Sequence, residues 1–157
     1  QQTTPYASNF GDIYFVPDHG LAESKAVFLT ANDLPQRWHN LQPAQTFTIF
    51  ETGFGSGLNF LVTLQAWKEY IAAVSAQPCL HFISIEKHPF RKEDALRVAQ
   101  NYPQFAAYVD DLVQQLYPLF NSGLHVLHFA PGVHLNRPVR LMHPRYQLYI
   151  APKTKGF

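Results

Sequence analysis

The clearest feature of the hydrophobic pattern is a short apolar run that ends in a glycine-rich turn and continues with helical periodicity. Residues 47–50 are apolar or β-branched, and Glu51 follows them just before the turn Gly53-Phe54-Gly55-Ser56-Gly57. From residue 58 to residue 71, apolar side chains recur at the three- and four-residue spacing of an amphipathic helix. This order predicts a strand, a tight turn and a helix.

The rest of the pattern predicts an α/β fold. Residues 80–85 form a second apolar run that ends in Glu86, and the 33 residues from Gly53 to Glu86 (86 − 53 = 33) leave room for one helix before a parallel neighbouring strand. The other predicted elements are a hairpin of residues 10–16 and Ala26–Leu29 with its turn at 17–20, a short helix around 34–39, helices at 92–100 and 105–116, and strands at 125–129 and 145–150.

We expect two segments along the chain. Residues 1–45 should form an N-terminal hairpin and loop segment, and residues 46–157 a Rossmann-like cofactor-binding domain whose C-terminal half is partial. The predicted fold class is therefore α/β, an incomplete Rossmann-like sheet preceded by a β-hairpin.

The glycine turn and the two acids indicate a nucleotide-like cofactor at the carboxyl ends of the first two strands. Glycine lets the backbone turn sharply and approach a ligand closely, and the start of the next helix offers free N–H groups. A carboxylate at Glu86 can accept hydrogen bonds from both hydroxyls of a ribose. The G-x-G-x-G spacing differs from that of dinucleotide binders, and no Lys-Ser/Thr pair follows it, which excludes a P-loop. The pattern favours S-adenosylmethionine over NAD or ATP.

Seven residues are the candidate cofactor contacts on this basis, and three of them have an alternative role. Asn59 could cap the helix, Phe54 could stack on the ligand or pack internally, and Glu86 could be a solvated acid at a strand end. No catalytic residue is assigned. The candidates are Glu51, Gly53, Phe54, Gly55, Gly57, Asn59 and Glu86.

The composition narrows the class of protein. A chain of 157 residues with 46% hydrophobic and 15% charged residues fits one globular domain. No apolar run approaches the roughly 20 residues that cross a bilayer, and the first residues lack the pattern of a secretory signal. Cys79 is the single cysteine, which excludes an internal disulfide and leads us to expect a cytoplasmic location.

Charge is distributed unevenly along the chain. Residues 1–122 contain all eleven acids and seven of the Lys and Arg residues, whereas residues 123–157 contain five Lys and Arg residues and no acid. This basic end could face the phosphates of a nucleic acid, or it could be a basic tail. His125, His128 and His134 lie there without a cysteine or a carboxylate nearby in the sequence, so we expect no metal site.

Three stretches, in the same order, resemble the methyltransferase domain of the MnmC family of bifunctional tRNA-modification proteins. Residues 50–60 resemble its cofactor motif, residues 11–29 its N-terminal hairpin and residues 80–89 its second strand, and the resemblance extends over about residues 10–129. It implies the sheet of a class I S-adenosylmethionine-dependent methyltransferase. It also implies transfer of a methyl group from S-adenosylmethionine to the amine of 5-aminomethyl-2-thiouridine, at the wobble position of tRNA.

The chain departs from the family pattern in its C-terminal part. Family members carry a D-G-F-A-P stretch after the fourth strand, next to the acceptor site. Here Phe129-Ala130-Pro131-Gly132 lacks the preceding acid, and no Asp or Glu follows His128. We therefore expect a truncated form or missing segments, with no room for the FAD-dependent domain of many members. Two functions remain open: a tRNA methyltransferase, or a non-catalytic Rossmann-like module that binds a cofactor or a partner.

Overall fold

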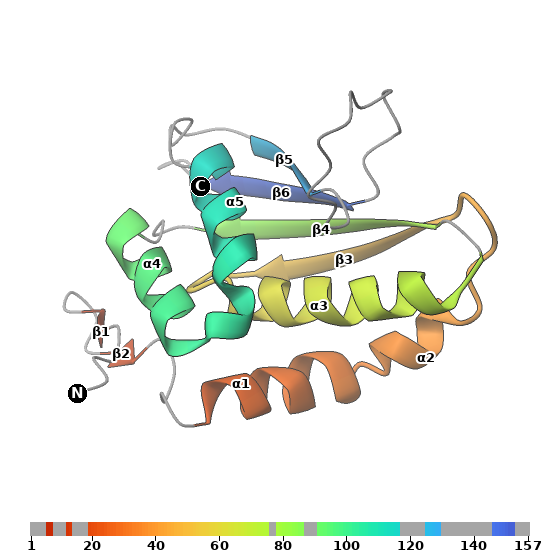
Figure 1. Cartoon of the computed structure of the whole chain (residues 1–157), viewed down its shortest axis with the longest axis horizontal. Helices are drawn as coiled ribbons and strands as arrows, with labels where there is room; N and C mark the ends of the chain where they lie inside the picture. The colour runs from red at the N-terminus through yellow and green to blue at the C-terminus, as the bar shows by residue number, and fades with distance from the viewer. Residues whose placement is uncertain are drawn as a thin grey trace.

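The computed structural model describes residues 6–7, 12–13, 19–75, 78–86, 91–116, 125–129 and 146–152. These residues form a mixed α/β fold on a four-stranded sheet (Figure 1). Its strands are β3 Thr46–Thr52, β4 Cys79–Glu86, β5 His125–Phe129 and β6 Tyr146–Pro152. The helical segments are α1 Gly20–Glu23, the π-helix η1 Ser24–Thr30, α2 Leu34–Trp38, α3 Leu58–Ala73, α4 Lys92–Asn101, the 3-10 helix η2 Pro103–Phe105 and α5 Ala106–Leu116.

The sheet has the order β3-β4-β6-β5, with β3, β4 and β6 parallel and β5 antiparallel to β6. The predicted parallel pairing of the first two central strands is confirmed. Its register sets Ile49 opposite Phe82 and Glu51 opposite Ser84. Because parallel strands end at the same edge, the carboxyl ends of β3 and β4 lie together next to the turn that leads into α3.

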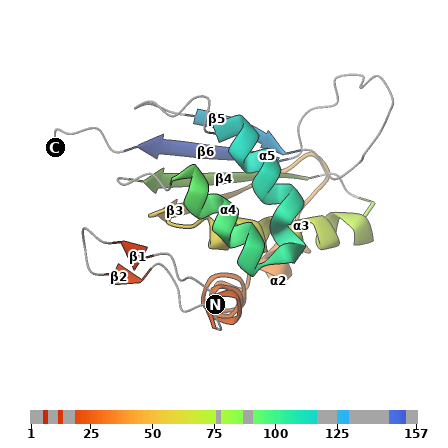
Figure 2. The ribbon, with the colours of Figure 1, turned by 60° about the vertical axis from the view of Figure 1, so that its left-hand side comes forward.

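One face of the sheet carries the hydrophobic core. Side chains alternate between faces along a strand, and in β4 every second residue, from Leu80 to Glu86, is buried. Phe60 of α3 contacts Phe82 of β4 and Phe129 of β5, with ring centroids 5.3 Å and 5.1 Å apart. Helices α3, α4 and α5 cover this face (Figure 2).

The helices before β3 pack on α3 through an aromatic cluster. Trp38 at the end of α2 is fully buried, and its ring meets that of Trp67 edge-on at 5.0 Å. Tyr70 completes the cluster, because its hydroxyl donates a 2.7 Å hydrogen bond to the Trp38 carbonyl. Both tryptophans are fully buried, and the cluster holds α2 against the C-terminal half of α3.

The predicted N-terminal hairpin is wrong in its second strand. Ala26–Leu29 lies within η1, not in a strand. The antiparallel pair that does form joins β1 Tyr6–Ala7 to β2 Asp12–Ile13. The physical reason is the burial pattern: Leu21, Ser24 and Phe28, which are at least partly buried, recur at helical spacing. The division of the chain at residue 45 stays a prediction.

The other sequence predictions agree with the structure to within a few residues. The strand at 46–52, the helix at 58–73, and the later helices and strands all form where the pattern placed them. No helix within the described ranges is long and apolar enough to cross a bilayer.

Candidate cofactor site

The turn between β3 and α3 needs glycine at its alternate positions. Gly53, Gly55 and Gly57 all have positive φ, of 88°, 53° and 75°, a backbone region that side chains with a Cβ rarely adopt. The turn is anchored at both ends, since Gly53 N–H donates to the Ile85 carbonyl at 2.7 Å and Gly57 N–H to the Phe54 carbonyl at 2.8 Å. A Cβ on Gly53 would meet no atom within 4 Å, so open space lies beside this part of the backbone.

Phe54 packs inside the turn. Its side chain is 7% exposed and its ring lies 6.2 Å from that of Phe60. A Cβ on Gly57 would lie 2.9 Å from the Phe54 ring, so this glycine also makes room for the phenylalanine. Of the two roles predicted for Phe54, internal packing is the one in the structure, and its partner is α3.

Glu86 binds the turn directly. The Gly55 N–H donates a 2.9 Å hydrogen bond to Glu86 Oε2, across 31 residues of sequence. The side chain is 9% exposed, so it is not the freely solvated acid that the alternative interpretation described. The carboxylate holds the tip of the glycine turn against the end of β4. Its assignment to a ribose stays a prediction.

Glu51 is a buried carboxyl with incomplete hydrogen bonding. It is 8% exposed, and Asn59 Nδ2 lies 3.4 Å from its Oε2. Glu51 Oε1 and Ser84 Oγ have no hydrogen-bond partner among the described residues. Burial raises the pKa of Glu51 to about 7, and the neighbouring charge of Glu86 adds to the rise, while the nearby Ser84 hydroxyl and Asn59 amide oppose it. A buried group of this kind is well suited to a cationic ligand, which would favour its ionised form.

Asn59 links two elements instead of capping the helix. The N-cap residue of α3 is Gly57, and no side chain caps this helix end. The Asn59 side chain accepts a hydrogen bond from Ser24 Oγ of η1 and points its amide toward Glu51. The alternative interpretation of Asn59 as a helix cap is therefore wrong, and its role as a cofactor contact stays a prediction. Asn59 connects the helix before β3 to the buried acid at the end of that strand.

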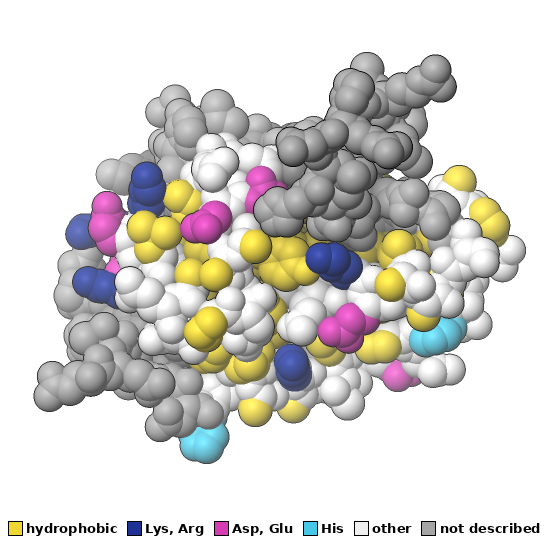
Figure 3. Space-filling model, viewed as in Figure 1, with side chains coloured by type: hydrophobic (Ala, Val, Ile, Leu, Met, Phe, Trp, Pro, Cys, Tyr) yellow, Lys and Arg dark blue, Asp and Glu magenta, His cyan; other side chains and the backbone are white. Residues whose placement is uncertain are grey.

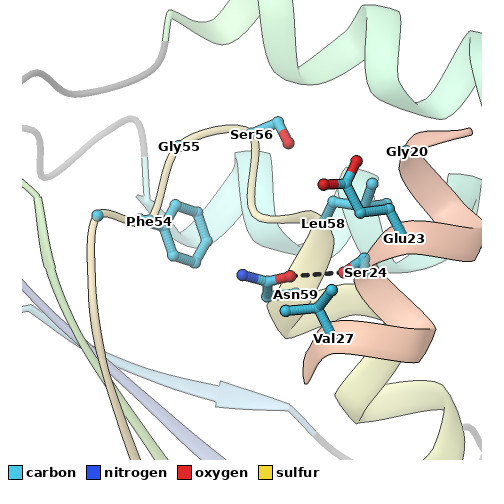
Figure 4. A pocket seen from close by; sticks show the side chains of 10 residues that line it. Gly20, Glu23, Ser24, Val27, Phe54, Gly55, Ser56, Leu58 and Asn59 are labelled. Carbon is cyan, nitrogen blue, oxygen red and sulfur yellow. Dashed lines mark hydrogen bonds between the residues drawn. The ribbon is translucent and has the colours of Figure 1, made fainter. Parts of the chain in front are cut away.

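A cavity of about 310 Å³ lies between the glycine turn and the first helical segment (Figure 4). Four of the seven predicted contacts line it, and each of the other three touches one of these four: Glu51 lies by Asn59, Gly57 is against Phe54, and Glu86 binds Gly55. The lining residues are Gly20, Glu23, Ser24, Val27, Gly53, Phe54, Gly55, Ser56, Leu58 and Asn59.

Sequence reasoning missed the wall formed by α1 and η1. The sequence prediction placed Gly20 in a turn and Val27 in a returning strand, with Glu23 and Ser24 between them, whereas all four belong to one helical stretch that faces the glycine turn. The signal available in the sequence was the helical spacing of Leu21, Ser24 and Phe28. Nothing local in the sequence shows that this stretch lies beside residue 55.

The site fits an adenosyl sulfonium cofactor in two respects. The open space beside Gly53 lets a ligand approach the backbone, and the orphaned Glu51 oxygen leaves a buried acceptor unused. No Lys, Arg or His lines the cavity among the described residues. Neither is there a group of three or more His, Cys, Asp or Glu residues in the described part of the chain that could hold a metal ion.

The predicted basic surface cannot be traced on the described residues. Figure 3 shows acidic and basic side chains interspersed over the helices on one face. All five Lys and Arg residues of 123–157 lie outside the described residues, as does His134. The assignment of this end to a nucleic acid stays a prediction.

Comparison with known sequences finds homologues of the chain. No family model matches it. A protein of Aeromonas salmonicida, named tRNA 5-methylaminomethyl-2-thiouridine biosynthesis bifunctional protein MnmC, is 44% identical over 131 residues, which are 82% of this chain. This chain is a homologue of the MnmC proteins. Relatives with the same name in Saccharophagus degradans and Legionella pneumophila are 41% and 38% identical, over 84% and 80% of the chain. The family resemblance found in the sequence is thereby confirmed.

The match covers only part of each relative. The chain spans about a fifth of the length of these MnmC proteins, 18–19%. Among solved structures, the crystal structure of MnmC2 from Aquifex aeolicus superposes with a TM-score of 0.61 at 15% identity, covering 96% of this chain and 39% of that one. This structural similarity shows a shared fold.

Proposed function

We propose that the chain carries the donor site of an S-adenosylmethionine-dependent methyltransferase that acts on the aminomethyl group of a wobble uridine in tRNA. The observation that supports this most is the glycine turn of a chain that is a homologue of MnmC. The turn lies beside two buried acids, Glu51 on β3 and Glu86 on the parallel strand β4. The sheet is of the Rossmann-like kind, in which ligands bind at the carboxyl ends of the strands.

The residues of the turn would hold the donor. The backbone at Gly53 and Gly55 would lie against the ligand, the buried Glu51 behind Asn59 would favour its positive charge, and Glu86 would accept hydrogen bonds from its ribose. The Glu86 carboxylate has acceptor capacity for more than its bond to Gly55, since a carboxylate offers about four lone-pair sites. When bound, S-adenosylmethionine supplies an electrophilic methyl group on a sulfonium.

The acceptor chemistry constrains what the chain must provide. An amine attacks a methyl group only in its unprotonated form, and the two reactants must be held in line. The MnmC relatives are named for biosynthesis of a tRNA nucleoside, 5-methylaminomethyl-2-thiouridine, which supports such an acceptor here. No residue of this chain is assigned to deprotonating the amine.

Two measurements, made one after the other, test the proposal. Calorimetric titration with S-adenosylmethionine should give saturable binding, and absence of both heat and a thermal shift would overturn the donor site. Transfer of a labelled methyl group to tRNA that carries the 5-aminomethyl-2-thiouridine precursor should then follow. A Glu86→Ala variant should lose about 1–3 kcal/mol of donor affinity, while Glu69→Ala, which removes an exposed acid of α3, should not.

A second function is favoured by one observation. No acid follows Asp111 in the sequence, so the later part of this chain supplies no carboxylate to the acceptor. This supports a non-catalytic module that binds the cofactor or a partner. Saturable donor binding without methyl transfer to the precursor tRNA would favour this alternative.

A further inference from the structure

The wall of the cavity opposite the glycine turn carries one charged side chain, Glu23. Figure 4 shows its carboxylate projecting from α1 across the cavity toward Ser56. Among the described residues this carboxylate has no hydrogen-bond or ion-pair partner. It is also the only ionisable side chain that lines the cavity in the described part of the chain.

The other acids of the site are already engaged or lie elsewhere. Glu86 accepts the Gly55 N–H, and Glu51 is buried behind Asn59 and does not line the cavity. Neither is therefore placed as Glu23 is, on an open wall with both carboxylate oxygens unused. A cationic group entering the cavity would meet Glu23.

The segment that carries Glu23 is fixed in position relative to the turn. Ser24, the next residue, is 8% exposed and donates a hydrogen bond to Asn59 of α3. That bond ties the start of η1 to the first turn of the helix that follows the glycines. The carboxylate is thus presented by a rigid element, as a specificity residue requires.

We infer that Glu23 is a specificity residue that pairs with the α-ammonium group of the amino-acid part of the methyl donor. This inference rests on the proposed function. The aminomethyl group of the acceptor can also form an alkylammonium ion, so it is a second possible partner for Glu23. Because Glu23 and the glycine turn line one cavity, the donor is the source that the observations favour.

The test compares two ligands that differ only in the ammonium group. S-adenosylhomocysteine carries it, and its deaminated analogue, S-adenosyl-4-thiobutanoate, does not. Both are titrated into the full chain, as wild type and as Glu23→Gln, by calorimetry or by competition. Glu69→Gln is the matched control, since it removes another exposed acid that lies on α3, outside the cavity lining.

Glu23→Gln should weaken S-adenosylhomocysteine by about tenfold, as expected for the loss of a charge-assisted hydrogen bond, and should leave the deaminated analogue unchanged. The loss should shrink with added salt, because the pair is partly exposed to solvent. Equal affinity of wild type and variant for S-adenosylhomocysteine overturns the inference, as does an equal loss for both ligands. If wild type binds neither ligand, the proposed function itself fails.

Discussion

Replacement of the buried acid by its amide, Glu51→Gln, should stabilise the protein in a pH-dependent way. The pKa of Glu51 is raised from 4.5 to about 7, with burial as the main cause. Between these two values the folded protein holds a proton that the unfolded chain has released. The free energy of unfolding of the wild type therefore falls as pH rises through this window.

The magnitude follows from the two pKa values. A tenfold change in an ionisation equilibrium is worth about 1.36 kcal/mol, so a rise from 4.5 to about 7 corresponds to about 3 kcal/mol above pH 7. Glutamine has the same shape and no charge to desolvate. The variant should therefore match the wild type near pH 4.5 and exceed it in stability by up to about 3 kcal/mol at pH 8.

Urea unfolding at pH 5 and pH 8 is the appropriate assay, and the buried rings of Trp38 and Trp67 provide its fluorescence signal. The informative quantity is the difference between variant and wild type at each pH, since other groups titrate equally in both. Glu69→Gln, at an exposed position of α3, should show no such difference. A Glu51→Gln effect of the same size at pH 5 and pH 8 would refute the reasoning.

Three further expectations follow from the described contacts. Gly57→Ala should lower the melting temperature more than Gly53→Ala. Both positions have positive φ, but only a Cβ at residue 57 would lie 2.9 Å from the buried Phe54 ring. Equal decreases in melting temperature would contradict the packing argument. Tyr70→Phe should cost about 1 kcal/mol, since it removes the 2.7 Å bond to the Trp38 carbonyl, and an unchanged urea midpoint would show that this bond contributes nothing. Binding of S-adenosylmethionine at pH 7 should release a proton from Glu51, so calorimetric enthalpies should differ between phosphate and Tris buffers; identical enthalpies would mean that Glu51 does not sense the ligand.

The strand–turn–helix unit could be predicted because all of its local signals agree. An apolar strand, glycines at three alternate positions and a long apolar run with helical spacing point to the same elements, and 46–73 folds accordingly. The segment at 26–29 could not, because a short apolar run fits a strand and a helix equally well. Only packing against α3 decides between them.

The sequence allowed us to predict which residues of the turn and strand ends belong to the site, but not the cavity that they help to form. The glycines and the acids at the strand ends were recognisable from spacing. The contribution of Glu23 was not, since it depends on a helix that returns beside the turn. The position of β6 between β4 and β5 was equally hidden, because strand order is a long-range property of the chain.

The bond between Glu86 and the Gly55 amide gives a single side chain two tasks. It fastens the turn before any ligand arrives, so the pocket edge is already shaped in the free protein. A ligand that recruits the same carboxylate must share it with the backbone. Any substitution there alters the receptor as well as the contact, and comparison of ligand-free turn dynamics in Glu86→Ala and wild type would separate the two effects.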